Sequence, residues 1–111
     1  MSKELVNAAA RSPIMLCAEP CDMRLGLPGL AKKVKAAGKD PRSKELYVFV
    51  SRDYRRVKLF YWDNNGYALW YKYVPSSIFR VEQTGGYRRI TGVKLAELIN
   101  RTEKPKKIGN A

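Results

Sequence analysis

The chain has 111 residues, enough for one domain with a modest core and too few for two. Its 22 Lys and Arg residues against ten Asp and Glu residues give a net charge of +12, which favours a polyanionic partner. No window approaches the roughly twenty apolar residues of a membrane span, and no apolar core of signal-peptide length is present. We therefore expect a cytoplasmic protein without a membrane partner.

The first third of the chain predicts a strand followed by a helix. Residues 1–12 are expected to be a disordered N-terminal segment, and the apolar run 14–18 to be a short buried strand. Residues with the i, i+3, i+4, i+7 spacing of one helix face come next: Leu27, Leu30, Ala31 and Val34. Gly38 suits the end of this short amphipathic helix.

The middle of the chain predicts a buried strand and then a hairpin. Residues 46–50 are apolar on both faces, which is typical of a strand in the middle of a sheet. Two aromatic and β-branched runs, 57–62 and 67–73, flank the turn sequence Asp-Asn-Asn-Gly. Both Trp residues and four of the seven Tyr residues lie in this hairpin. Aromatic side chains beside a basic cluster indicate a nucleic-acid surface built on a small sheet.

The turn allows two registers of the hairpin. With Asp63 opening a type I turn and Gly66 as a bulge with positive φ, Lys58 is opposite Lys72 on one face. With a two-residue Asn-Gly turn, Lys58 instead faces Tyr73, and the two lysines lie on opposite faces. We favour the first register, in which replacing both lysines should relieve a repulsion and leave the fold intact.

The last third predicts two short strands, over 78–81 and 87–90, and a helix capped by Thr91. Residues 102–111 are expected to be a basic, disordered tail, so one globular domain spans 13–101. The predicted fold class is α+β: a mainly antiparallel β-meander of four to six strands with a central aromatic hairpin and two short helices.

Four separated motifs carry a family resemblance. They are Asp22-Met23-Arg24 with Gly26 and Gly29, then Asp40-Pro41 with Ser43, then the start of the strand 46–50, Leu46-Tyr47-Val48-Phe49, then Lys58, Trp62-Asp63, Gly66 and Leu69-Trp70-Tyr71-Lys72. In this order and spacing the chain resembles the TnpB (second open reading frame) accessory protein of the IS-sixty-six class of bacterial insertion sequences. The resemblance runs from about Pro13 to Arg101. The chain departs from the family pattern at 73–79 and at Asp53-Tyr54, which interrupts the arginines before the hairpin.

The resemblance implies participation in transposition beside a separate transposase that carries the catalytic acidic residues. We therefore expect a non-catalytic accessory factor that binds DNA, with the element's ends as the candidate site, or binds a transposase–DNA complex. The alternative is a protein-interaction adaptor, in which the aromatic sheet contacts the transposase and the lysines only keep the surface soluble. Salt dependence separates the two, because neutralising phosphates releases counterions.

The candidate nucleic-acid-binding residues are cations and ring side chains of the hairpin and its flanks: Arg24, Arg52, Arg55, Arg56, Lys58, Lys72, Tyr71 and Tyr73. A second set is assigned to structure or to the family motif: Asp22, Met23, Gly26, Gly29, Trp62, Asp63, Gly66 and Trp70. Trp62 and Trp70 are expected to pack in the core, since a domain with only three Phe residues needs other large rings inside. Asp22 and Arg24 are expected to form an ion pair near the start of the first helix.

We predict no enzyme activity, no cofactor and no metal site. Cys17 and Cys21 are the only cysteines and the chain has no His, whereas a structural zinc site needs about four such ligands. Reduced, partly buried thiols are favoured over metal or redox chemistry. The aspartates lie in separate loops and turns, so the converging carboxylates of two-metal phosphoryl transfer are not expected.

Overall fold

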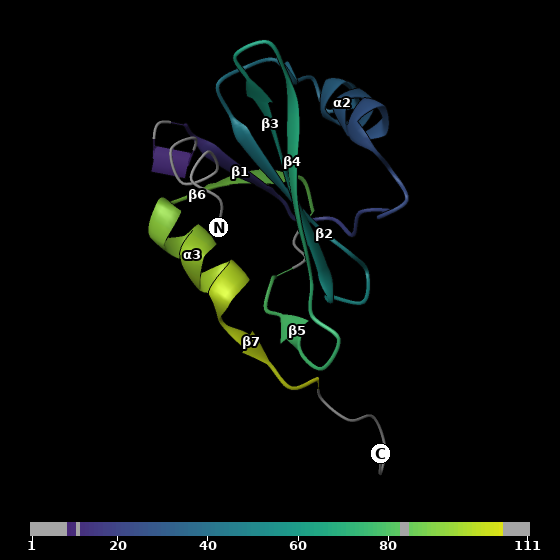
Figure 1. The fold of residues 1–111 in the computed structure, drawn as a ribbon, viewed down its shortest axis with the longest axis vertical. Helices are drawn as coiled ribbons and strands as arrows, with labels where there is room; N and C mark the ends of the chain where they lie inside the picture. Colours follow the sequence, from purple (N-terminus) through teal and green to yellow (C-terminus); the bar gives the residue numbers. More distant parts are fainter. Residues whose placement is uncertain (1–8, 11, 83–84, 106–111) are drawn as a thin grey trace.

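The computed structural model describes residues 9–10, 12–82 and 85–105. Its helices and strands follow the chain in the order shown in Figure 1: β1 (Ile14–Cys17), α2 (Leu27–Ala36), β2 (Leu46–Val50), β3 (Arg56–Asp63), β4 (Gly66–Tyr73), β5 (Ile78–Phe79), β6 (Tyr87–Ile90), α3 (Gly92–Asn100) and β7 (Thr102–Glu103). The fold is α+β, as predicted, and the strand bounds at 46–50 and 87–90 match the expected ones.

The main sheet has five strands in the order β4-β3-β2-β1-β6. Strands β2, β3 and β4 form an antiparallel meander, and β6 runs antiparallel to β1. The sheet departs from an all-antiparallel arrangement at β1 and β2, which pair in parallel with Ile14 opposite Leu46. A parallel pair needs a long crossover, and α2 is the element that joins these two strands along the chain.

The two helices cover opposite faces of the sheet, as Figure 1 shows. On one face, Leu30, Ala31 and Val34 of α2 pack with Tyr47, Phe49 and Phe60. On the other face, Leu95, Leu98 and Ile99 of α3 pack with the alternate residues of β2 and β3, among them Val48 and Leu59, and with Phe79 of β5. Because β2 contributes to both cores, all five of its residues are buried. Helix α3 begins as predicted, with the Thr91 hydroxyl accepting a hydrogen bond from the Lys94 amide at 3.1 Å.

The hairpin adopts neither expected register. Asp63 is opposite Gly66, Lys58 is opposite Tyr71, and Lys72 is opposite Val57. The connection is a two-residue loop in which Asn64 takes the left-handed backbone conformation, with φ of 55°. Asn tolerates this region better than most residues, so Gly66 does not need positive φ and joins the strand. The predicted pairing of Lys58 with Lys72 is therefore wrong.

The boundary of the C-terminal tail also differs from the prediction. Thr102 and Glu103, which we placed in the tail, form β7 and pair with Phe79 and Ile78 of β5. The rest of the predicted tail and most of the predicted N-terminal segment fall on 106–111, 1–8 and 11, outside the described residues. In the part that the structure describes, no helix is long and apolar enough to cross a membrane.

Candidate nucleic-acid interface

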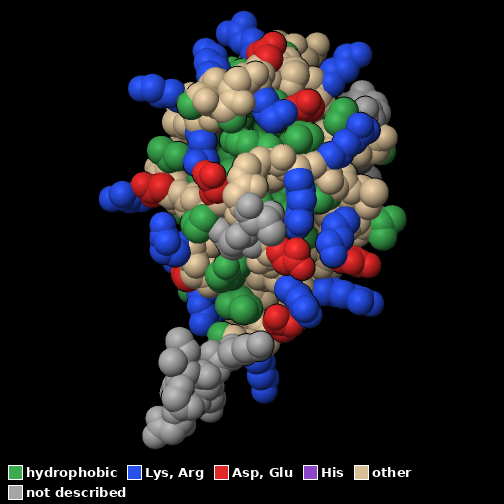
Figure 2. All heavy atoms as spheres, turned by 180° about the vertical axis from the view of Figure 1, so that it is seen from behind, with side chains coloured by type: hydrophobic (Ala, Val, Ile, Leu, Met, Phe, Trp, Pro, Cys, Tyr) green, Lys and Arg blue, Asp and Glu red, His purple; other side chains and the backbone are tan. Residues whose placement is uncertain are grey.

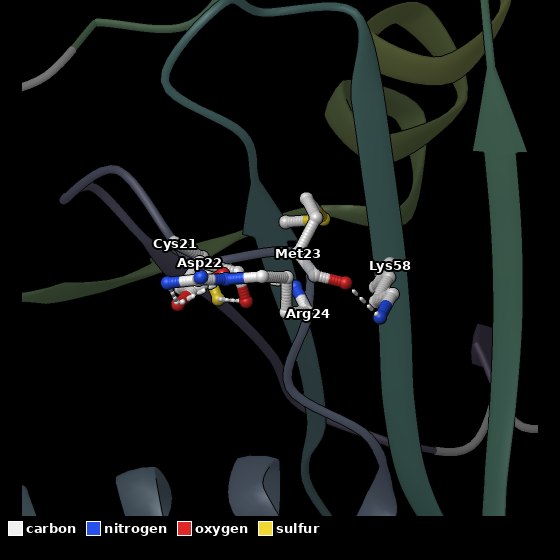
Figure 3. Close-up of polar contacts among 5 residues, drawn as sticks. All are labelled: Cys21, Asp22, Met23, Arg24 and Lys58. Carbon is white, nitrogen blue, oxygen red and sulfur yellow. Dashed lines mark hydrogen bonds and ion pairs between the residues drawn. The ribbon is translucent and has the colours of Figure 1, made fainter.

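The loop between β1 and α2 is organised by the expected pairing of Asp22 with Arg24. The Asp22 carboxylate accepts hydrogen bonds from the Arg24 backbone amide at 2.9 Å and from Nε and Nη2 of its guanidinium at 3.0 and 2.9 Å (Figure 3). These hydrogen bonds from Arg24 hold the pKa of Asp22 at about 2, below its ordinary 3.8. Arg24 itself stays 91% exposed, so the pair presents a guanidinium at the surface.

Lys58 fixes this loop to the sheet. It lies on the α2 face of β3, is only 9% exposed, and donates hydrogen bonds to the Met23 and Leu25 carbonyl oxygens, both at 2.8 Å. Figure 3 shows the ammonium group reaching from the strand toward the Met23 carbonyl. We expected Lys58 to contact phosphate, but the structure commits two of its three N–H donors to the loop. These two hydrogen bonds connect β3 to the loop between β1 and α2.

Lys72 lies on the opposite face of the sheet. Its Nζ donates to the Ile99 carbonyl oxygen at 2.8 Å, in the last turn of α3, where a cation also interacts favourably with the helix dipole. Because each lysine satisfies backbone carbonyls, the expectation that replacing both would relieve a repulsion is wrong. The structure instead indicates that each replacement removes a stabilising contact.

The basic turn that leads into β3 is held by side-chain hydrogen bonds. The Ser51 hydroxyl donates to Asp53 Oδ1 at 2.6 Å and accepts from the Arg56 amide at 3.0 Å. The hydrogen bond from Ser51 is the main cause that lowers the pKa of Asp53, and the Arg55 amide and the Arg56 guanidinium lower it further. Tyr54 has a φ of 60°, a conformation that is rare for a bulky residue, and its side chain packs against the α3-side core. Asp53-Tyr54 therefore shapes the turn that carries the arginines.

The three arginines of this turn have different surroundings. Arg55 is tied inward, because its Nη1 donates to the Pro75 and Ser77 carbonyl oxygens at 2.9 and 3.2 Å. Arg56 pairs with Asp53 at 2.9 Å, and its guanidinium lies over the Tyr73 ring, 4.6 Å from the centroid. Arg52 is exposed and has no hydrogen bond or ion pair within the described residues. Of the three, Arg52 is the best placed to contact a ligand.

We call the loop between β1 and α2 the Asp22 loop. A groove of about 930 Å³ lies between this loop and the basic turn that leads into β3. Four cationic side chains and two carboxylates line it: Arg24, Lys33, Arg52 and Arg56 with Asp22 and Asp53. Tyr71 of β4 also borders the groove. We call the surface formed by Arg24, Lys33, Arg52, Arg56, Tyr71 and Tyr73 the Arg52 face. Lys33 was not among the predicted site residues. The helical spacing around Leu30 predicted the helix but did not indicate that Lys33 faces the basic turn.

Positive charge alone does not locate an interface. On the side of the molecule seen in Figure 2, Lys and Arg side chains are spread over the whole outline, with acidic side chains among them. Exposed rings are more selective. Tyr71 and Tyr73 are 48% and 47% exposed and lie on the same face of β4, with Leu69 in the same row at 38%. The Arg52 face is where these rings adjoin the cation-lined groove.

The two Trp residues are partly buried rather than enclosed. Trp70 packs against the α3-side core, as expected. Trp62, which we also expected in the core, belongs to neither core cluster of the described residues. It contacts the Tyr67 ring edge to face at 5.0 Å, and the Arg42 guanidinium lies 4.9 Å from its centroid. The Arg42 contact was not predicted, since nothing in the spacing of 42 and 62 indicates it.

The remaining motif residues have local structural roles. Gly26 is the N-cap of α2, and a Cβ on Gly29 would lie 2.8 Å from Leu25 Cδ2, so that position favours glycine. Cys17 and Cys21 are buried free thiols, and burial raises the pKa of Cys21 to about 11. Among the described residues, no group of three His, Cys, Asp or Glu side chains is arranged to hold a metal ion.

Comparison with known proteins identifies the family. The family model described as "IS66 Orf2 like protein" matches residues 12–105, which include the Asp22 loop, the basic turn and the hairpin. The uncharacterized protein y4jC of Sinorhizobium fredii (strain NBRC 101917 / NGR234) is 34% identical over 67 residues, which cover 60% of this chain and 57% of that protein. This chain thus spans less than two thirds of that relative, and no solved structure matches. The matched residues make up most of the chain, and it therefore belongs to the IS66 Orf2-like family of insertion-sequence accessory proteins.

Proposed function

We propose that this protein is a non-catalytic accessory factor of DNA transposition that binds DNA through the Arg52 face, alone or within a complex with the transposase. The observation that carries the proposal is the meeting of a cation-lined groove with two exposed tyrosine rings. Single-strand binders combine these two features, since cations contact phosphates and rings stack on bases. Membership of the family supports the link to transposition. We also propose that the protein acts in the cytoplasm and that its DNA target is the ends of the element.

We propose different roles for the cationic side chains on and near the Arg52 face. Arg52 has no competing partner among the described residues, and Arg24 is highly exposed despite its ion pair. Both guanidiniums can donate to phosphate oxygens, which accept paired N–H groups well. Lys58 and Lys72 contribute to the field of the protein while their ammonium groups hold carbonyls. We therefore move the proposed phosphate contacts from the lysines of the hairpin to the arginines of the groove.

The proposal assigns structural roles to the carboxylates of the groove. Asp22 is occupied by Arg24, and Asp53 by Ser51 and Arg56. Phosphoryl transfer with two metals needs acidic groups that converge on one point with free oxygens. These two carboxylates instead stabilise a loop and a turn, which supports an accessory role beside a catalytic transposase.

A second function, as a protein adaptor, is favoured by one observation. Leu69, Tyr71 and Tyr73 form an exposed row on β4, an edge strand of the main sheet. Exposed aromatic and apolar side chains are also typical of the centre of protein interfaces. In this case the row would dock on the transposase, and binding would depend weakly on salt.

Fluorescence anisotropy with DNA of the element's ends and with scrambled DNA tests the proposal. Exchanging Arg52 and Lys33 for Gln should weaken binding and reduce the slope of log K against log salt by roughly 1.5 to 2 units. The matched control replaces Arg89 and Lys94, two exposed cations outside the groove, with Gln. If both variants lose the same affinity, binding comes from net charge and the Arg52 face is not the site. If DNA does not bind at low salt and the transposase does, the adaptor function is correct.

A further inference from the structure

We infer that Tyr71 and Tyr73 form a platform for two unpaired nucleobases, so that the Arg52 face prefers single-stranded over double-stranded DNA. This inference rests on the proposed function and names the form of DNA that the site takes. It is carried by three features of the two rings: the support behind each ring, their spacing along β4, and the position of the groove beside them.

Each ring is supported from one side by a cation that is itself held in place. The Arg56 guanidinium lies 4.6 Å from the Tyr73 centroid and is fixed by Asp53 at 2.9 Å. The Lys58 ammonium lies 5.7 Å from the Tyr71 centroid and is fixed by the Met23 and Leu25 carbonyls. Because the rings are held, a base that stacks on them does not have to immobilise them first. About half of each side chain remains open to solvent.

The spacing of the rings excludes neighbouring bases of a duplex. Tyr71 and Tyr73 are two positions apart on one strand, which places them on the same face about 6.8 Å apart along the chain. Stacked bases within one strand of B-DNA follow one another at about 3.4 Å. One base on each ring therefore requires a strand stretched to about twice the duplex rise, which only an unpaired strand can adopt. Rings on a sheet are used in the same way by small single-strand binding domains.

The groove provides for the phosphates of such a strand. Tyr71 borders the groove that Arg24 and Arg52 also line, so a nucleotide on Tyr71 lies beside two exposed guanidiniums. Duplex DNA can use these cations as well, but it presents base edges rather than base planes to the rings. The rings are consequently the element that separates the two forms of DNA, while the cations bind both.

Anisotropy titrations with a labelled 12-nucleotide oligomer of mixed sequence and with its 12-base-pair duplex test the inference. We expect at least a tenfold preference for the single strand, and exchange of both tyrosines for Ala should remove it, lowering single-strand affinity roughly tenfold or more. Exchange for Phe keeps the rings and should keep the preference. Thermal melts of both variants verify the fold, and in the Ala variant single-strand affinity should fall by a larger factor than duplex affinity.

Two results would overturn the inference. Equal affinity of the unchanged protein for both forms of DNA would show that the rings do not stack on bases. A loss of single-strand and duplex affinity to the same degree in the Ala variant would show that the rings support the binding of any DNA and do not select unpaired bases. In either case the proposed DNA-binding function stands if the Arg52 and Lys33 variant still loses affinity, and it fails together with the inference if no DNA binds.

Discussion

Replacing Lys58 with Met tests how the Asp22 loop is held. Met keeps most of the aliphatic volume inside the sheet and removes the ammonium group, so the Met23 and Leu25 carbonyls lose donors at 2.8 Å. A buried group left without its partner costs about 1 to 3 kcal/mol. Water can reach part of this loop and recover some of the loss, so we expect a decrease of about 2 to 3 kcal/mol in the free energy of unfolding.

Urea unfolding followed by tryptophan fluorescence measures this change. With an m-value of about 1 to 3 kcal/mol per molar urea, the midpoint should fall by roughly 1 M. Lys72→Met is the matched control, because it removes one hydrogen bond, to Ile99 at the end of α3, and should cost about 1 kcal/mol. Amide exchange in 22–25 should accelerate in the Lys58 variant alone. If the Lys58 variant is as stable as the Lys72 variant and the loop exchanges at its original rate, Lys58 does not anchor the loop.

Three further predictions concern single groups. Thr91→Ala removes the cap on the Lys94 amide and should lower the stability by about 1 kcal/mol in a thermal melt, whereas Thr91→Ser should cost much less. The pKa of Asp22 is lowered, so its ion pair should be complete above about pH 4 and lost as the pH falls through about 2; an NMR carboxyl titration measures this, and an unshifted midpoint would contradict it. Burial raises the pKa of Cys21 to about 11, so alkylation at pH 8 should be far slower in the folded protein than in urea, and equal rates would disprove the burial.

The elements that were predicted well have strong local signals. The strand 46–50 is apolar on both faces, and both faces of the sheet are covered by a helix. Thr91 precedes an apolar helical repeat and caps it. The register of the hairpin has no such signal, because Asp-Asn-Asn-Gly is compatible with several turns. In the structure, the turn is the one in which Asn64 has a positive φ.

The errors at the site arise from contacts between distant parts of the chain. Lys58 meets carbonyls 33 and 35 positions away, and its burial depends on where α2 and the loop before it pack. One sequence signal did indicate this burial. Lys58 lies between Val57 and Leu59, which face one side of the sheet, and it shares the other side with Phe60. A lysine on a buried face needs a hydrogen-bond acceptor within the protein. The parallel pairing of β1 with β2 is likewise a property of the whole sheet, since four residues of β1 do not specify a neighbour.

The open edge of β4 affects how complexes of this protein behave in concentrated solution. The strand has eight residues, and no described strand pairs with its outer side, so its backbone can join that of another copy. Mutual repulsion from the net charge of +12 keeps free molecules apart. Bound DNA cancels that charge, so edge-to-edge precipitation should be worst where the charges of protein and DNA balance. DNA in excess reverses the net charge of the particles and should return them to solution.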